Sequence, residues 1–211
     1  MKTILYAFLL MAGSLRSQSL LHLHDGTIKN SNNHTLNLKG CNLGNWLMLE
    51  MWMLDYADSS ISDQYEFIKT LNNRFGNDEA ERIMDIYRTN WIQEEDFDII
   101  QSFGMNTVRL PFDYKLLMDS DEKPFRLKDD AWEWLDQAIA MAKKRDMYVI
   151  LDMHGAPGRQ SGMDHSGRVG YNKLWSNKDY QKQTAWLWNQ ISQRYKKEPA
   201  VAAYDLLNEP W

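Results

Sequence analysis

A carboxylate and an amide close the apolar segment "AYDLLNEPW". Glu209 follows Asn208 directly, and Pro210 favours an extended backbone at Glu209. An apolar strand that ends in polar residues presents them at its C-terminal end, where a partly desolvated Glu209 can serve as a general acid and Asn208 can bind a substrate hydroxyl. Neighbouring residues of a strand face opposite sides, so both reach one site only if the strand ends or bulges there. The alternative for Glu209 is a structural salt bridge.

Further polar residues lie near the ends of other apolar segments. Arg109 in "TVRLP" is costly in a buried position without a carboxylate partner. No such partner is evident at the other strand ends, so we expect one in a segment beyond this chain. His154, after Asp152 in "LDMHGAPG", can donate a hydrogen bond to a substrate hydroxyl or adjust a neighbouring acid. It is otherwise a core histidine with a satisfied hydrogen bond. Asn42 closes the first such segment and is a further candidate for substrate binding.

The sequence gives little indication of a reactive thiol, a metal site or a nucleotide site. Cys41 is the single cysteine, so no disulfide forms within the chain, and its place between Gly40 and Asn42 favours a small buried hydrophobe over a reactive thiol. His22 and His24 share a face of a possible strand, but no cysteine cluster or H-E-x-x-H spacing accompanies them. We therefore assign no metal. The sequence has no G-x-G-x-x-G loop, and we expect no cofactor.

The segments that position these residues alternate between strands and helices. The segment 35–42 is strand-like, and further strands are predicted at 106–112, 147–155 and 200–210. Helical spacing of apolar residues predicts helices at 62–76, 77–91, 93–104, 129–146 and 176–199. We expect Ser62 and Asn77 as N-caps and Gly104 as a C-cap. Within 129–146, one apolar stripe contains Trp132, Leu135, Ile139 and Ala142. Before them, tight turns at 25–26 and 30–33 predict short paired strands.

Strands that are apolar on both faces and alternate with helices form a parallel sheet with covered faces. Either a (β/α)8 barrel or an open doubly wound sheet fits this alternation. Polar residues at the C-terminal ends of several strands, together with the lack of a phosphate-binding loop, favour the barrel. Such a barrel has about 250 residues and eight units, and only about the first four units are visible here. We therefore expect this chain to be the N-terminal half of a barrel.

Composition and charge narrow the class of protein. The 211 residues are 44% hydrophobic and 25% charged, which is typical of a globular domain, and no linker divides the chain. A formal charge of −5 without a basic stripe disfavours nucleic acid and anionic membranes as partners and favours a neutral substrate. Residues 1–19 combine Lys2, a short apolar core and small residues before a possible cleavage site, which predicts a secretory signal. The alternative is a first strand or helix of the fold. We expect residues 20–211 to form one domain without a transmembrane segment or an evident protein partner.

Nine tryptophans suggest a carbohydrate ligand, since flat aromatic rings suit the apolar faces of pyranose rings. The four that lie in predicted helices are expected to pack in the interior: Trp132, Trp134, Trp186 and Trp188. Trp46, Trp52 and Trp175 lie in predicted loops at the strand ends and are candidates for sugar platforms.

Four segments resemble, in order, the glycoside hydrolase family 5 enzymes, especially the exo-β-1,3-glucanase-like branch. They are "LKGCNLGNWLMLEMW", "GMNTVRLPF", "VILDMHGAPGRQSGMDHSG" and "YDLLNEP". The resemblance implies an eight-stranded β/α barrel that hydrolyses β-glucosidic bonds with retention. It implies that Glu209 is the acid/base, that Asn208 binds the substrate 2-hydroxyl, and that Arg109 and His154 support them. Glu50 and Asp164 resemble residues that line the glucose subsites.

Two departures from the family accompany this resemblance. His165 stands where the branch usually has asparagine, so sugar recognition at the first subsites is expected to differ. The family's nucleophile is a glutamate on the seventh strand, which this sequence does not contain. Retaining hydrolysis needs two carboxyls about 5 to 5.5 Å apart, so we expect the chain alone to be inactive.

The sequence thus predicts a secreted retaining β-glucan hydrolase with β-1,3-glucan as the preferred substrate. Cellulase or β-1,6-glucanase activity within the same family is an alternative. A second alternative is a glucan-binding protein that has the same polar residues at the C-terminal rim of the barrel but does not hydrolyse the glucan. A third is an unrelated barrel enzyme that uses Glu209 as a base on a carbonyl substrate. A glutamate ending a strand about 80 to 120 residues further on would favour the hydrolase, whereas a lysine or metal ligands there would favour the carbonyl enzyme.

Overall fold

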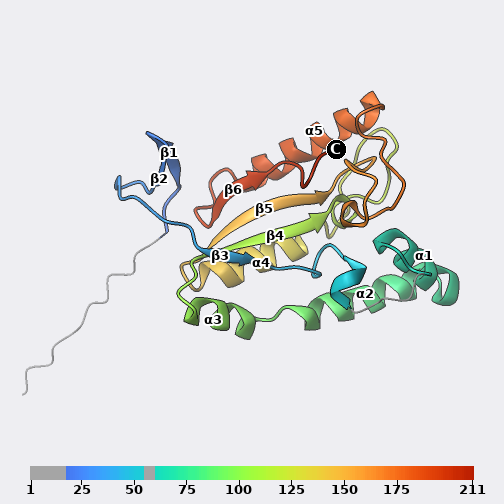
Figure 1. Cartoon of the computed structure of the whole chain (residues 1–211), viewed down its shortest axis with the longest axis horizontal. Coiled ribbons are helices and arrows are strands. Elements are labelled where there is room, and N and C mark those ends of the chain that lie inside the picture. The colour runs from blue at the N-terminus through green and yellow to red at the C-terminus, as the bar shows by residue number, and fades with distance from the viewer. Residues whose placement is uncertain (1–17, 55–59) are drawn as a thin grey trace, which may run out of the picture.

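A four-stranded parallel sheet is the centre of the fold (Figure 1). The computed structural model describes residues 18–54 and 60–211. The strands of the sheet are β3 (Gly40–Asn42), β4 (Thr107–Asp113), β5 (Tyr148–Gly155) and β6 (Val201–Asp205), and they lie in the order of the sequence, β3-β4-β5-β6. A separate antiparallel hairpin, β1 (His22–His24) and β2 (Thr27–Lys29), precedes them.

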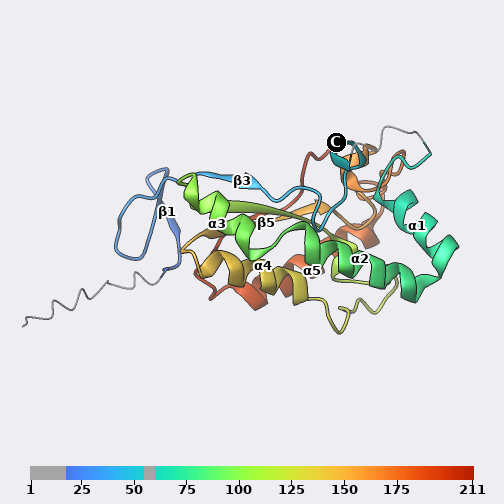
Figure 2. The ribbon, with the colours of Figure 1, turned by 90° about the horizontal axis from the view of Figure 1, so that it is seen from below.

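Helices connect these strands. The α-helices are α1 (Gln64–Phe75), α2 (Asn77–Trp91), α3 (Glu94–Ser102), α4 (Glu133–Lys143) and α5 (Lys178–Tyr195), and the short 3₁₀ turns are η1 (Met51–Leu54), η2 (Tyr114–Leu116) and η3 (Asp164–Ser166). In Figure 2 helices α3, α4 and α5 lie on one side of the sheet. A doubly wound sheet has helices on both faces and a strand order that reverses, whereas consecutive order with helices on one side is the arrangement of a barrel wall.

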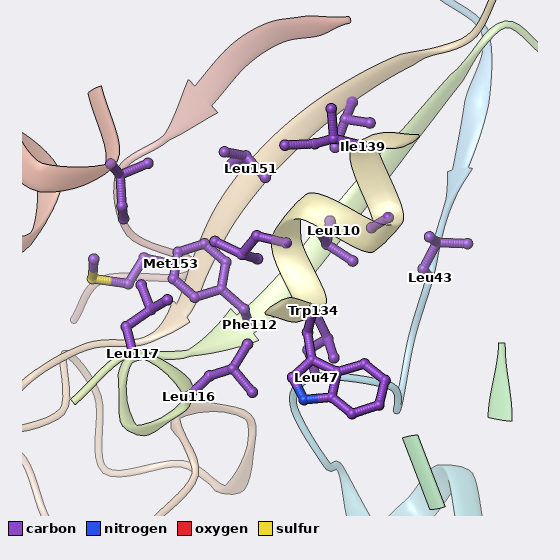
Figure 3. Close-up of a cluster of buried hydrophobic side chains, with 14 of the residues drawn as sticks. Leu43, Leu47, Leu110, Phe112, Leu116, Leu117, Trp134, Ile139, Leu151 and Met153 are labelled. Carbon is purple, nitrogen blue, oxygen red and sulfur yellow. The ribbon is translucent and has the colours of Figure 1, made fainter. Parts of the chain in front are cut away.

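The core lies between the sheet and these helices (Figure 3). Alternate residues of β4 and β5 point toward α4, among them Leu110, Phe112, Leu151 and Met153, and all four are fully buried. On the opposite face, Arg109 and Ile150 lie side by side in register and are only half-buried. This second face corresponds to the interior of a barrel, so the charged residues of the strands are brought together there.

Close backbone contact joins β3 to β4. Gly40 pairs with Thr107, and a Cβ atom at Gly40 would lie 1.8 Å from the Thr107 carbonyl oxygen. A residue without a side chain is therefore required at this position. The strand here is shorter than the predicted 35–42, because regular pairing begins only at Gly40.

All five predicted helices and the strands predicted at 106–112 and 147–155 are confirmed, with shifts of a few residues at their ends. The strand predicted at 200–210 is present but spans only Val201–Asp205. The three predicted caps are each displaced by one residue. The N-cap of α1 is Asp63, whose carboxylate accepts a hydrogen bond from the Glu66 N–H at 2.9 Å, rather than Ser62. Asn77 is the first residue of α2, and Gly76 precedes it as an N-cap without a side-chain hydrogen bond. The C-cap of α3 is Phe103 rather than Gly104, which follows it with a positive φ of 74°.

The N-terminal hairpin turns at Asp25 and Gly26, as predicted, and Lys29 then bridges to Thr35 across the predicted second turn. The predicted secretory signal, residues 1–19, lies outside the described residues except for its last two positions. Within residues 18–54 and 60–211, no helix is long and apolar enough to cross a membrane.

Candidate active site

Arg109 is the centre of an ion-pair network on the interior face of the sheet. Its Nη2 lies 2.8 Å from Asp205 Oδ2 on β6 and 3.0 Å from Asp152 Oδ2 on β5. The same nitrogen donates to Asn208 Oδ1 at 3.0 Å, and Nη1 donates to Asn42 Oδ1 at 3.4 Å. The prediction that the carboxylate partner of Arg109 lies beyond this chain is therefore wrong. Parallel register places Asp152 beside Asp205, and both carboxylates reach the guanidinium from neighbouring strands.

His154 extends this network toward the loop after β3. Its Nδ1 lies 2.6 Å from Asp152 Oδ2, and its Nε2 lies 3.6 Å from Glu50 Oε1 and 3.2 Å from Asn208 Nδ2. Burial lowers the pKa of His154, but the two carboxylates outweigh burial and raise it to about 9. The same contact with His154 lowers the pKa of Glu50. The two carboxylates therefore favour the protonated form of this buried imidazole.

Glu209 stands at the rim, beyond the end of β6. The strand ends at Asp205, and Glu209 has a φ of 38°, so its backbone is left-handed rather than extended as Pro210 led us to predict. Its carboxyl is 60% exposed, so the predicted desolvation is wrong for this structure. Asn208, in contrast, is buried and fixed by Arg109. Because β6 ends before Asn208, the strand geometry does not force Asn208 and Glu209 to opposite faces, and both can take part in one site.

The loop after β5 brings His165 to Glu209. His165 Nδ1 lies 3.7 Å from Glu209 Oε2, while its Nε2 lies 2.9 Å from Ser161 Oγ, which orients the ring. Asp164 is half-buried beside it in η3, and its side chain makes no hydrogen bond with the described residues. This loop therefore places one imidazole next to the exposed carboxyl.

A buried glutamine holds this loop against the strand ends. Gln160 Nε2 donates to the carbonyls of His154 at 2.6 Å and Asn208 at 2.9 Å, and its Oε1 accepts from the Ala156 N–H. Its own carbonyl accepts from the indole of Trp175 at 2.9 Å. Gln160 thus ties β5, β6 and the loop together, and no feature of the sequence singled it out.

The aromatic candidates separate into two groups. Trp46 is 0% exposed, and its indole donates to the Arg88 carbonyl, so it belongs to the core and the prediction that it is a sugar platform is wrong. Trp52 and Trp175 are 67% and 49% exposed. The indole of Trp52 donates to Glu50 Oε2 at 2.9 Å, so one ring is attached directly to the Glu50–His154 pair. The four helical tryptophans pack against the core as predicted.

At the edge of the sheet, Asn42 and Cys41 line a recess of about 210 Å³ with Arg109 and Ile150. Asn42 is exposed apart from its bond to Arg109. Cys41 is half-buried rather than fully buried, and burial raises the pKa of its thiol. A raised pKa keeps the thiol protonated and weakly nucleophilic, in line with the structural role we predicted.

In chemical terms, the site combines an exposed carboxyl with buried polar groups that are already oriented. Residues 18–54 and 60–211 contain no group of three histidine, cysteine or acidic side chains placed to hold a metal ion. Glu209 can exchange a proton with a bound molecule, and Asn208, His154 and Glu50 can hydrogen-bond its hydroxyl groups. Such an arrangement suits general acid or base chemistry on a polyhydroxy substrate.

Sequence reasoning missed Asp205, Ser161 and Gln160. Asp205 carried a usable signal, since an acidic residue inside an apolar strand matches the need of Arg109 for a carboxylate. Ser161 and Gln160 have no such signal in the sequence, because their contacts in the site depend on how the loop folds back over the strand ends.

Comparison with known proteins agrees with this geometry. The family model described as "Cellulase (glycosyl hydrolase family 5)" matches residues 76–211. Probable glucan 1,3-beta-glucosidase A of Aspergillus fumigatus is 34% identical over 178 residues, and glucan 1,3-beta-glucosidase of Blumeria graminis is 36% identical over 180 residues. Each alignment covers 82% of this chain and 41% of the relative. The chain therefore spans about two fifths of the length of these curated relatives.

Two solved structures share the fold over most of the chain. Rutinosidase from Aspergillus niger superposes with a TM-score of 0.70 at 21% identity, over 83% of this chain and 49% of that structure. Endogalactoceramidase superposes with a TM-score of 0.62 at 19% identity, over 91% of this chain and 44% of that structure. The aligned part of this chain thus corresponds to about half of each neighbour.

Proposed function

The chain belongs to glycosyl hydrolase family 5, the cellulase family, and on that premise we propose that it acts as a retaining glycosidase on a neutral β-glucan. β-1,3-linked glucan is the first choice of substrate, because the curated relatives above are named glucan 1,3-beta-glucosidases. β-1,4- and β-1,6-linked glucans come next. The fold is a (β/α)8 barrel of which about four units are present.

We assign the role of acid/base to Glu209. Asn208 holds the hydroxyl next to the reacting carbon, and Arg109 fixes the Asn208 amide through the 3.0 Å hydrogen bond to Oδ1. Glu50 and His154 bind further hydroxyl groups, with Asp164, His165 and Asn42 around them and Trp175 as a platform. A retaining mechanism also requires a second carboxyl about 5 to 5.5 Å from Glu209, and we assign none within this chain.

The observation that carries this proposal is the contrast between Asn208 and Glu209. The amide is buried and bound to Arg109, whereas the neighbouring carboxyl is exposed at the rim beside His165. A fixed binding group next to an accessible acid is what protonation of a leaving oxygen requires.

The test compares two substrates in the full-length protein. Glu209→Gln should reduce hydrolysis of unactivated β-1,3-glucan by about 10² to 10⁴, because a basic leaving oxygen needs a proton. It should preserve much of the glycosylation step on an aryl glucoside with an acidic leaving group, measured as a pre-steady-state burst. Glu122→Gln, the same change at an exposed loop residue, should leave both rates unchanged. Equal loss on both substrates would reject the assigned role.

We also propose that the protein is exported through residues 1–19. Mass spectrometry of the secreted protein should find an N-terminus at or near residue 20. A protein that retains residues 1–19 and stays inside the cell would contradict this proposal.

A further inference from the structure

A second groove lies outside the candidate active site. It has a volume of about 680 Å³ and is bordered by α1, the segment after β4 and the loop between β5 and α5. None of Glu50, His154, Asn208 or Glu209 lines it. Its size is that of a small-molecule site, and larger than a bare ion needs.

Arg168 is the distinctive group in this groove. Its guanidinium carbon lies 3.9 Å from the centre of the Tyr65 ring and 4.4 Å from the centre of the Tyr171 ring. Contact with two aromatic rings holds the guanidinium plane while leaving its N–H edge unused. Within the part of the chain that the structure describes, no carboxylate pairs with Arg168 and no acceptor receives a hydrogen bond from its side chain.

The two rings are themselves held in place around Arg168. The Tyr65 N–H donates to the Gly167 carbonyl at 3.0 Å, and the Val169 N–H donates to the buried N-cap carboxylate Asp63 at 2.7 Å. The Tyr171 hydroxyl lies 3.1 Å from that of Tyr180. The guanidinium is therefore fixed before any ligand arrives, which reduces the entropy lost on binding.

Among the described residues, the basic side chains of this groove have acidic partners, with one exception. Five basic and three acidic side chains line the groove, although the whole chain carries a formal charge of −5. The other four basic side chains are compensated: Lys69 by Glu66, Lys115 by Asp121, Lys128 by Glu81 and Asp119, and Arg159 by Asp113. Among the described residues, Arg168 is thus the one lining cation without an acidic partner.

We propose that this groove binds an oxyanion, a carboxylate or a phosphate, carried on a polar molecule of sugar size, with Arg168 as its anion contact. A guanidinium matches the two oxygens of such a group, and the amides of Asn72 and Asn73 on α1 face the same groove and can bind hydroxyl groups. The proposal is independent of the role of Glu209, because no residue of the candidate active site takes part.

Calorimetric titration of the full-length protein tests this site with three probes: glucuronate, inorganic phosphate and neutral glucose. Glucuronate should bind more tightly than glucose, and more weakly as salt is raised. If phosphate alone binds as tightly as glucuronate, the ligand is a phosphate source; if glucuronate binds more tightly, it is an acidic sugar. Both results support an oxyanion site. Absence of binding of both anions would overturn it.

Variants localise the binding. Arg168→Gln should weaken it by about tenfold or more, because a charge-assisted hydrogen bond is lost. Arg168→Lys, which keeps the charge but not the planar group, should be intermediate. Arg74→Gln removes the same charge from an exposed position on α1 outside the groove and should change nothing. Unchanged binding in a folded Arg168→Gln variant would reject the assignment.

A measurement on the unmodified protein covers the case in which Arg168 variants fail to fold. Phenylglyoxal modifies accessible arginines, and peptide mass spectrometry follows each of them separately. The tighter-binding anion should slow modification of Arg168 severalfold and leave Arg74 unaffected. Equal rates at Arg168 with and without the anion would contradict the proposal.

Discussion

At the end of β5, the imidazole of His154 lies between the carboxylates of Asp152 and Glu50. Its pKa is about 9 in the folded protein, and the ordinary value is 6.5. A group whose pKa is raised by folding binds its proton more tightly in the folded state, so it contributes stability when protonated. That contribution is complete below about pH 6.5 and is lost as the pH rises to about 9.

We therefore expect the free energy of unfolding of the full-length protein to fall between pH 6.5 and 9, by about 3 kcal/mol from this group. Urea unfolding at several pH values measures it. His154→Gln should remove most of this pH dependence, whereas His34→Gln, at an exposed position, should retain it. Parallel curves for the unmodified protein and His154→Gln would show that His154 is not the titrating group.

Among the elements, β3 and β4 make a contact that leaves no room for a side chain at Gly40. The two strands meet at Gly40 and Thr107, and their pairing extends over only three residue pairs. This short pairing also sets the position of Asn42 relative to Arg109, and of the loop that carries Glu50. A local change at Gly40 should thus act on both stability and the site.

Gly40→Ala should lower the free energy of unfolding by about 2 to 3 kcal/mol, because the new Cβ meets a backbone oxygen that cannot move aside. Thermal or urea unfolding provides the measurement. Gly162→Ala is the matched control, since a Cβ there meets nothing closer than 3.9 Å, and its effect should stay within about 0.5 kcal/mol. Similar values for the two variants would contradict the steric argument.

At the scale of the whole molecule, the four-stranded sheet is covered by helices on one face only (Figure 2). Its edge strands are β3 and β6, and neither has a second neighbour among the described residues. The opposite face carries the charged network together with apolar groups such as Ile150. Unpaired strand edges and a partly apolar face both favour association with other protein surfaces.

Residues 20–211 produced on their own should therefore self-associate or aggregate, as measured by light scattering after size-exclusion chromatography. They should also show no retaining glycosidase activity, because Glu209 can protonate a leaving oxygen but the second carboxyl is not assigned within this segment. A soluble monomer that hydrolyses β-glucan at about 1 to 1000 per second would contradict both expectations.

The sequence by itself determined the elements and the direction in which the strands present their polar residues. Apolar periodicity depends on neighbours within a few residues, so the alternation of strands and helices could be read directly. The barrel class followed from polar residues at strand ends, and Asn208, His154 and Arg109 were recognised as rim residues for the same reason. The helix caps at Asp63 and Gly76 were missed, because Ser62 and Asn77 are equally good caps by residue type.

Only the tertiary structure decided which groups meet. Arg109 pairs with Asp152 and with Asp205, which is 96 residues away, and the register of three strands decides that both carboxylates reach the guanidinium. Likewise Trp46 is buried, Glu209 is exposed and Arg168 has no acidic partner among the described residues, although their local sequences do not distinguish these outcomes. Burial and charge pairing depend on segments far apart in the chain, and the packing of strands, helices and loops brings those segments together.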